Sequence, residues 1–320
     1  MDQSVDAQVG SIRTAAAVVE LPEVEAFLLE GEDARRWCNG MFTNNVKQLR
    51  PGEGNRHAMC DDRGRVGGLL NLHCIDDQRF LVVLDGISFR AFHERYKMYL
   101  ILDDIELEQA EDHCMLTIQG PQAASILGRV GLPAPEDGHS RVDGGDDLLA
   151  GTHILTRDRS GVGGFDLLIP RDRLADQQQA LINAGAAPMG ADALEAQRIA
   201  HGRASWPQDG TEKSLVHELA LEGEVCSFTK GCYLGQEVIN RVDVKGQVAK
   251  RITGLVIQGD APALGTEVHL EGKAIGSISS TTTLAGKTLA LATLRRAAWE
   301  PGTVLHVGNQ VATTAPFPLA

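Results

Sequence analysis

The stretch KGCYLGQEVINR, residues Lys230–Arg241, carries the most specific information in this sequence. It places Cys232 two residues after Lys230 and just before a predicted helix whose first turn contains Gln236 and Glu237. A neighbouring ammonium and the positive end of a helix both lower the pKa of a thiol, and the thiolate attacks electrophiles or binds metals. The segment therefore predicts an accessible, activated cysteine.

The same residues also permit a purely structural interpretation. Most free cysteines are buried and behave as small hydrophobic side chains. Glu237 and Arg241 are four residues apart, in the orientation that stabilises a surface helix by about 0.2–0.5 kcal/mol. The two glycines of the segment, Gly231 and Gly235, would then be ordinary turn residues. The residues alone leave both interpretations open.

The composition is that of a globular chain with an excess of acids. The 320 residues include 30 Lys and Arg and 43 Asp and Glu, which gives a net charge of −13. This charge argues against strong direct binding to nucleic acid, which depends on Lys and Arg that neutralise phosphates. No apolar run approaches the roughly 18 residues of a membrane helix, and the N-terminus lacks the features of a secretory signal. We therefore expect a cytoplasmic protein without a membrane partner.

The cysteines and histidines do not form a recognisable metal or disulfide pattern. Six cysteines are scattered at positions 38, 60, 74, 114, 226 and 232, without a C-x-x-C pair. This pattern favours free thiols in a reducing compartment. The ten histidines are dispersed, and we expect no metal site built by the protein alone. Cys226 and Cys232 could still share a metal or a disulfide if a turn brings them together.

The first two thirds of the chain alternate between hairpin and helix patterns. Two apolar segments, 57–60 and 66–75, flank a turn and predict a hairpin. Aromatic residues recur with helical spacing between Phe89 and Tyr99, which predicts a helix docked on a sheet. Further strands are predicted at 80–84, 105–109, 114–119, 153–156 and 164–169, helices at 31–40, 121–128, 174–184 and 191–201, and a loop at 130–147. This mixed order predicts an α+β fold with mostly antiparallel sheets.

After Arg241 the pattern changes to short Val, Ile, Leu and Thr runs broken by glycine. Five such runs lie at 252–257, 266–270, 274–283, 288–293 and 304–311. Closely spaced strands of this kind predict a small all-β barrel or sandwich. We therefore divide the chain into an α+β region, 1–243, and a C-terminal β-barrel domain, 244–320. A boundary between two subdomains of the first region is expected within 110–150.

The string K-G-C-aromatic-x-G-Q-E-x-x-x-R resembles the signature of the YgfZ family, the folate-binding relatives of the glycine-cleavage aminomethyltransferase. Other segments are similar to elements of the same family, at 31–46, 119–121, 163–166 and 198–202. The resemblance implies a GcvT-like fold, in which two ferredoxin-like subdomains and a C-terminal all-β barrel surround a central cavity. It also implies that this cavity binds tetrahydrofolate or a one-carbon derivative.

The sequence departs from the aminomethyltransferase pattern in two places. Where the resemblance leads us to expect an acidic pair beside the hairpin, this chain has Gly67 and Gly68. The helix-end glutamate that contacts the pterin in the family is replaced by Ala200, and Glu195 lies five residues upstream. Transfer at a folate amine requires proton handling. The lost acidic pair therefore disfavours a transferase, and the affinity for folate stays open.

The candidate site residues follow from the motif and the resemblance. Cys232 and Lys230 would carry the chemistry at the mouth of the folate pocket. The candidate folate-binding residues are Asn44, Asn45, Glu195, Arg198, Trp206, Tyr233, Gln236, Glu237 and Arg241. Four of these residues have structural alternatives: Trp206 as a packing residue, Arg198 on a solvated helix face, and the two asparagines as turn residues.

Three functions are compatible with these observations. The resemblance implies a folate-binding accessory protein that supports assembly or repair of iron–sulfur clusters in selected enzymes, including tRNA-modifying ones, with client or assembly proteins as partners. The second is a folate-dependent aminomethyl- or methyltransferase. The third is a thiol-redox or sulfur-carrier protein that uses Cys226 and Cys232.

Overall fold

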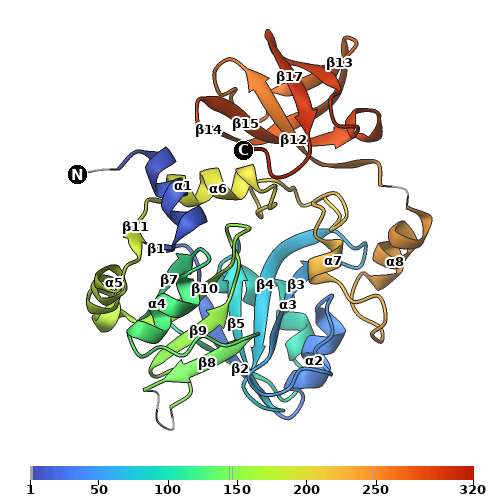
Figure 1. Cartoon of the computed structure of the whole chain (residues 1–320). Coiled ribbons are helices and arrows are strands. Elements are labelled where there is room, and N and C mark those ends of the chain that lie inside the picture. Colours follow the sequence, from blue (N-terminus) through green and yellow to red (C-terminus); the bar gives the residue numbers. More distant parts are fainter. Residues whose placement is uncertain (1–2, 144, 146, 247) are drawn as a thin grey trace.

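The computed structural model describes residues 3–143, 145, 147–246 and 248–320. Its strands form a six-stranded sheet, a five-stranded sheet and a closed six-stranded barrel. Figure 1 shows the barrel at one end of the molecule, with α1 (Val5–Thr14) and α6 (Ala191–Ala200) between it and the two sheets. The predicted α+β fold with a C-terminal β-barrel is confirmed. No helix in the described part of the chain has the length and apolar character needed to cross a membrane.

The five-stranded sheet has the order β3-β4-β5-β2-β6, with all neighbours antiparallel. Its strands are β2 (Ala26–Glu30), β3 (Gly54–Cys60), β4 (Val66–Cys74), β5 (Arg79–Asp85) and β6 (Glu106–Gln109). Two helices cover one face, α2 (Ala34–Met41) and α3 (Phe89–Leu100). Phe92 and Tyr96 of α3 are fully buried there, and the Phe92 ring lies 4.7 Å from that of Phe27 on β2. The helix predicted from aromatic spacing is thus confirmed.

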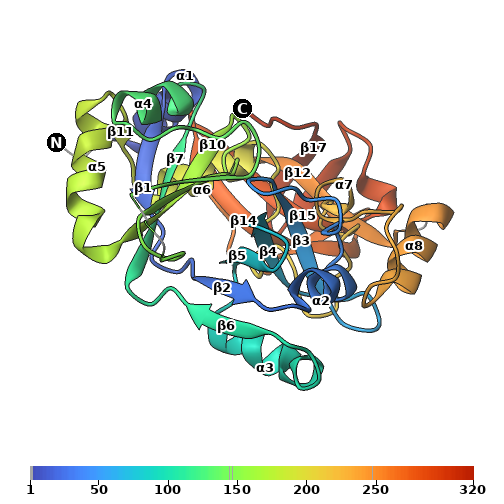
Figure 2. The same ribbon diagram turned by 90° about the horizontal axis from the view of Figure 1, so that it is seen from below.

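The six-stranded sheet has the order β11-β1-β7-β10-β9-β8, and only β1 and β11 pair in parallel. Its strands are β1 (Ala17–Glu20), β7 (His113–Gln119), β8 (His139–Val142), β9 (Thr152–Thr156), β10 (Gly164–Pro170) and β11 (Ala187–Pro188). On one face lie α4 (Ala123–Arg129) and α5 (Leu174–Asn183), which follows the short helix η1 (Arg171–Arg173). Figure 2 shows α5 outside this sheet and α3 outside the five-stranded one, so the remaining faces turn toward the middle of the molecule.

One hydrophobic cluster joins the two sheets to the barrel. It contains Leu168 from the six-stranded sheet, Leu81 from the five-stranded sheet, Ile199 from α6 and Leu291 from the barrel. Burial of apolar surface is the main favourable term in folding. The three units therefore share a core, and the space that they surround has fixed walls.

Two sequence predictions about the first region need correction. The six-stranded sheet is discontinuous in sequence, because α1 and β1 precede the whole five-stranded sheet and the chain returns only at β7. A single boundary within 110–150 therefore describes only the return of the chain from the five-stranded sheet to the six-stranded one, and not its earlier passage from β1 to β2. The predicted loop at 130–147 contains β8, a half-exposed edge strand whose polar sequence HSRV lacks an apolar face. Gly144 and Asp146 of that segment lie outside the described residues.

The barrel has the closed order β12-β15-β14-β13-β16-β17. Its strands are β12 (Lys250–Gln258), β13 (Glu267–Leu270), β14 (Lys273–Leu284), β15 (Lys287–Arg295), β16 (Val304–Val307) and β17 (Gln310–Ala315), with the short helix η2 (Arg296–Ala298) after β15. The single run predicted at 304–311 forms two strands, because the chain turns at Gly308 with a φ of 57°. The predicted domain boundary at 243/244 falls inside α8 (Gln236–Lys245). After β17 the chain returns to α6, where Leu319 N donates to Ala200 O at 2.7 Å.

The motif segment Lys230–Arg241 packs on the five-stranded subdomain. Leu234 N donates to Gly40 O at 3.0 Å near the end of α2. Gly235 is the N-cap of α8 and has a φ of 83°. A Cβ at this position would lie 2.5 Å from the carbonyl oxygen of Asp61 in the β3–β4 turn. The positive φ and this close approach both require glycine.

We expect Gly235→Ala to lower the free energy of unfolding by about 1–3 kcal/mol, because it adds left-handed strain and a backbone clash. Gly231→Ala is the matched control in the same segment, since a Cβ there meets nothing within 4 Å. Urea unfolding of both variants checks the prediction. Equal stability of the two variants would show that the close approach to Asp61 is not a constraint.

Candidate functional site

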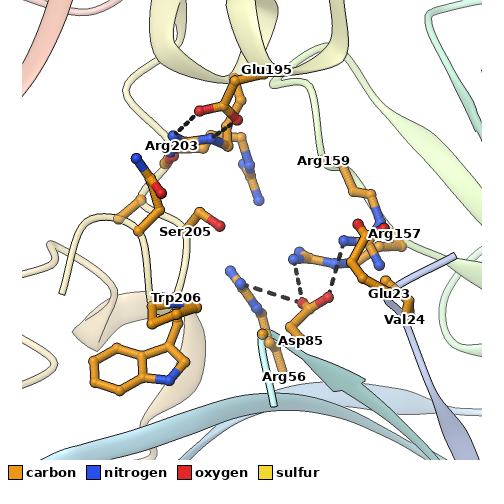
Figure 3. A pocket seen from close by; sticks show the side chains of 15 residues that line it. Glu23, Val24, Arg56, Asp85, Arg157, Arg159, Glu195, Arg203, Ser205 and Trp206 are labelled. Carbon is orange, nitrogen blue, oxygen red and sulfur yellow. Dashed lines mark hydrogen bonds and ion pairs between the residues drawn. The ribbon is translucent and has the colours of Figure 1, made fainter. Parts of the chain in front are cut away.

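A cavity of about 350 Å³ opens between the two sheets, α6 and the loop that follows α6. Figure 3 shows charged side chains that enter it from all these elements. Its guanidinium groups come from β3, from the segment after β9, and from α6 and the following loop: Arg56, Arg157, Arg159, Arg198 and Arg203. Three carboxylates line it as well: Glu23, Asp85 and Glu195. The lining is therefore polar, with more cationic than anionic groups.

The most enclosed of these carboxylates is Asp85, the last residue of β5, which is only 7% exposed. Its Oδ2 lies 2.8 Å from Nη2 of Arg157 and 3.6 Å from Nη2 of Arg56. Its Oδ1 lies 3.0 Å from Nη1 of Arg159. Burial alone would raise the pKa of Asp85, but Arg159, Arg157 and Arg56 together hold that pKa well below its usual range. Asp85 is thus a permanently ionised group at neutral pH.

Two further carboxylates balance these guanidinium groups. Asp166 on β10 is 1% exposed and accepts from Nη2 of Arg159 at 2.7 Å. Glu224 on α7 (Glu222–Val225) lies 3.0 Å from Arg56 and 3.5 Å from Arg157. Burial raises the pKa of Glu224, but the neighbouring arginines outweigh this and lower it. The cluster joins both sheets and α7 through paired charges, as buried ions require.

The α6 side of the cavity contains three residues that were predicted from the sequence. Arg198 donates Nε and Nη2 to the two carboxylate oxygens of Glu195, both at 2.7 Å. Nη1 of Arg198 lies 2.6 Å from the buried carboxylate of Asp209. Trp206 lies in the loop after α6 and also lines the cavity, but it is buried in a hydrophobic cluster, which agrees with its structural alternative as a packing residue. The structure therefore brings Glu195, Arg198 and Trp206 together, and Arg198 is a buried, paired residue rather than one on a solvated face.

Asp85 was not among the residues predicted from the sequence, where the acidic pair of the family was expected at the position of Gly67 and Gly68. A Cβ on Gly67 would meet the guanidinium of Arg95, and one on Gly68 would meet Ile87 and Met59. Neither glycine lines the central cavity. The sequence did contain a usable indication, because Asp85 ends an apolar strand and precedes Gly86, a pattern typical of polar residues at sheet edges. Asn71 on the adjacent β4 donates weakly to Asp85, at 3.4 Å.

The remaining predicted folate-binding residues do not line the cavity. Asn44 Oδ1 accepts from Asn45 N at 2.8 Å, and Asn45 Oδ1 accepts from Gln48 N at 3.3 Å. Both asparagines thus form turn hydrogen bonds, the structural alternative considered above. Tyr233, Gln236, Glu237 and Arg241 lie in or before α8 and are also absent from the lining. Tertiary packing directs the motif toward α2 and away from the cavity.

Cys232 is exposed, whereas the five other free cysteines of the chain are buried. This confirms its predicted accessibility, although Cys232 is not among the residues that line the central cavity. Cys226, by contrast, is buried, and burial raises the pKa of its thiol to about 12. The two thiols therefore differ strongly in environment, which gives no support to a working redox pair.

The predicted action of Lys230 on the Cys232 thiol finds no supporting contact among the described residues. Lys230 is buried, and its Nζ donates to Phe42 O at 2.7 Å and to Asn44 O at 2.6 Å, just after α2. The same Nζ lies 4.8 Å from the centre of the Tyr233 ring. Carbonyls at a helix C-terminus attract cations. Lys230 therefore anchors the loop that displays Cys232, and burial lowers the pKa of Lys230 to about 8.

Comparisons with known proteins agree with this architecture. Residues 1–230 match the family model described as the GCVT N-terminal domain. An aminomethyltransferase from Staphylococcus carnosus is 23% identical over 311 residues, which cover 93% of this chain and 84% of that relative. A putative chloroplastic transferase from Arabidopsis thaliana is 24% identical over 88% of this chain, which spans only 64% of that relative. The crystal structure of glycine cleavage system aminomethyltransferase T from Bartonella henselae has the same fold, with a TM-score of 0.87, 18% identity and coverage of 99% of this chain and 90% of that one.

We expect Asp85→Asn to lower the free energy of unfolding by about 3–5 kcal/mol, because it leaves buried guanidinium groups without their shared counter-ion. The folded-state pKa of Asp85 is depressed, so its stabilising contribution is present at neutral pH and is lost as the pH falls below about 4. Urea unfolding at several acidic pH values should therefore show a weaker acid dependence in the variant. Asp77→Asn is the control, since its carboxylate pairs with Arg35 while 91% exposed. An Asp85 variant as stable as this control would contradict the prediction.

We expect the free energy of unfolding to rise with pH between about 8, the folded pKa of Lys230, and its ordinary value of 10.5. Over this range the unfolded chain binds more protons than the folded one, so removing protons favours folding. This rise of the free energy of unfolding with pH should disappear in Lys230→Met and persist in a Lys47→Met control. Urea midpoints between pH 7 and pH 10.5 measure it. A constant difference between wild type and Lys230→Met across this range would rule out a buried, proton-poor lysine.

Proposed function

The chain belongs to the GCVT N-terminal domain family, and on this basis we propose that it is a folate-binding accessory protein for iron–sulfur enzymes. Its ligand would be tetrahydrofolate or a one-carbon derivative, held in the central cavity. Its role would be assembly or repair of clusters in selected enzymes, including tRNA-modifying ones. Client or assembly proteins would be its partners.

The residues of the cavity fit a folate. The glutamate tail of folate carries carboxylates, which guanidinium groups bind through paired, charge-assisted hydrogen bonds. Nε of Arg56 and Nε of Arg157 are buried and have no hydrogen-bond partner among the described residues, so the cavity wall has unused donors. Arg203 is partly exposed at the same cavity and is the most accessible guanidinium for a tail carboxylate.

The opposite end of folate, the pterin, presents N–H donors and a flat ring. Glu195 is the accessible carboxylate on α6, with a side chain that is 44% exposed, and it would accept from those donors. It would replace the glutamate that the family pattern places at Ala200, which here is fully buried. Trp206 lines the cavity from the loop after α6, but it is only 7% exposed and packs in a hydrophobic cluster with Leu219 and Val225, so it supports the cavity wall. Bound folate would supply a carrier for a one-carbon unit, and these residues would orient it.

The observation that favours binding over group transfer is the pairing of Asp85. A carboxylate that moves a proton at neutral pH needs a pKa near that pH. The pKa of Asp85 is held far below this range by Arg159, Arg157 and Arg56. The most enclosed acid of the cavity is thus suited to fixing arginines in place and is a poor proton acceptor.

The exposed thiol supports a role with protein partners. Cys232 lies on a loop tied to α2 through Lys230 and Leu234, so it is accessible and fixed at the same time. Because Cys232 does not line the cavity, we place its contact with a cluster or a sulfur species of a partner protein, on the surface. Pre-organised reactive groups lose less conformational entropy when a partner binds.

We expect Cys232→Ala to bind tetrahydrofolate as the wild type does, but to fail in restoring the activity of cluster-containing enzymes in a strain that lacks this protein. Isothermal titration with tetrahydrofolate and its 5-formyl derivative measures the first property, and complementation measures the second. Thr229→Ala is the control for loop changes, because Thr229 is exposed in the same loop and its hydroxyl lies 3.5 Å from that of Ser227. Full rescue by Cys232→Ala would show that the thiol is not needed for the function. Absence of heat on titration of the wild type would contradict the proposal that the protein binds folate.

A second candidate is a folate-dependent aminomethyl- or methyltransferase, which is favoured by the names of the similar proteins. Incubation with tetrahydrofolate and candidate amine or methyl donors separates the two functions. Formation of 5,10-methylene- or 5-methyl-tetrahydrofolate would support the transferase. Tight binding without turnover would support the accessory role.

A further inference from the structure

One wall of the central cavity is a single continuous loop. Residues 203–208, which follow α6, all line the cavity and include Arg203 and Trp206. The loop has no regular secondary structure to hold it, apart from turns. Its shape therefore depends on tertiary contacts: Ala204 and Trp206 pack in a hydrophobic cluster, and the carboxylate of Asp209 binds the loop at Ser205.

The side chain of Asp209 is fully buried and accepts hydrogen bonds from three structural units. Its Oδ2 accepts from Arg198 Nη1 on α6 at 2.6 Å and from the backbone N–H of Ser205 in the loop at 2.9 Å. Its Oδ1 accepts from the hydroxyls of Ser279 and Ser280 on β14 of the barrel, at 2.6 and 2.7 Å. Buried carboxylates are retained only when such partners are complete.

The barrel strand is specially shaped for this contact. Successive side chains of a regular strand point to opposite faces. The pairing of β14 with β15 shifts register between Ile278 and Ser280, a β-bulge that allows Ser279 and Ser280 to reach the same oxygen. Gln208 adds a hydrogen bond from Nε2 to Ser279 O at 2.8 Å. The bulge thus directs two consecutive hydroxyls at the base of the cavity wall.

We propose that Asp209 is a positioning residue through which the barrel sets the shape of the folate cavity. It holds Arg198 against Glu195 and fixes the loop 203–208, so that Arg203 stays at the cavity. The barrel therefore contributes to ligand affinity without lining the cavity itself, since no residue beyond Gln208 does so among those described. The identity of the ligand in this inference rests on the proposed function, whereas the positioning of the loop does not.

The test uses Ser279→Ala/Ser280→Ala in the full chain, with Asp209→Asn as a second variant. The double serine variant removes the barrel donors to Asp209 and also the Ser280 Oγ that accepts from Arg198 Nη2 at 2.8 Å. It keeps the pair between Arg198 and Asp209, so it avoids an unpaired buried charge. Arg251→Ala is the matched control, because it breaks a different contact between the barrel and the first region, with Glu222 at 3.5 Å. Hydrogen–deuterium exchange of residues 203–210 without ligand is the first measurement, and titration with tetrahydrofolate is the second.

We expect the amides of residues 203–206 and 208–210 to exchange at least ten times faster in both variants, while β7 and β12 keep their protection. The Kd for tetrahydrofolate should rise about tenfold. Arg251→Ala should change neither. Wild-type exchange and affinity in the double serine variant would overturn the inference, as would faster exchange spread evenly over the chain. If wild type binds no folate but the loop still exchanges faster in the variants, the proposed ligand is wrong and the positioning role stands.

Discussion

The buried carboxylate of Asp85 ties the two sheets of this protein together. Asp85 ends β5 of the five-stranded sheet, whereas Arg157 and Arg159 follow β9 of the six-stranded sheet. Ions buried at such a junction are tolerated only when their partners are present and well placed. This cluster supplies three of the five guanidinium groups of the cavity and holds its two sheet walls together, beside the hydrophobic cluster that the sheets share.

The sequence predicted most of the fold because its patterns are local. The aromatic spacing of α3 and the short runs of the barrel both specify an element and the face that it buries. Two features of the fold could not be predicted from local sequence patterns. β8 is a polar edge strand, and the discontinuous six-stranded sheet depends on pairing between distant segments, for which no local pattern exists. Such pairings are decided by tertiary packing.

The candidate site was predicted unevenly for the same reason. Glu195, Arg198 and Trp206 lie on α6 and its following loop, so a correctly placed helix brought them to the cavity. The motif around Cys232 predicted an exposed thiol, but spacing along the chain could not reveal that Lys230 turns toward the end of α2. The arginines around Asp85 come from separate elements, and only the three-dimensional arrangement shows that their charges converge.

The parallel pair of β1 and β11 has a consequence for synthesis of the chain. Ala17 pairs with Ala187, so one neighbour of β1 is made 170 residues after it. The five-stranded sheet is complete by Gln109 and can form while the rest of the chain is still on the ribosome. β1 stays unpaired until β7 and then β11 have been synthesised. Non-local pairing of this kind slows folding and leaves strand edges open to other chains, so the first strand of the sheet is the last to gain both of its neighbours.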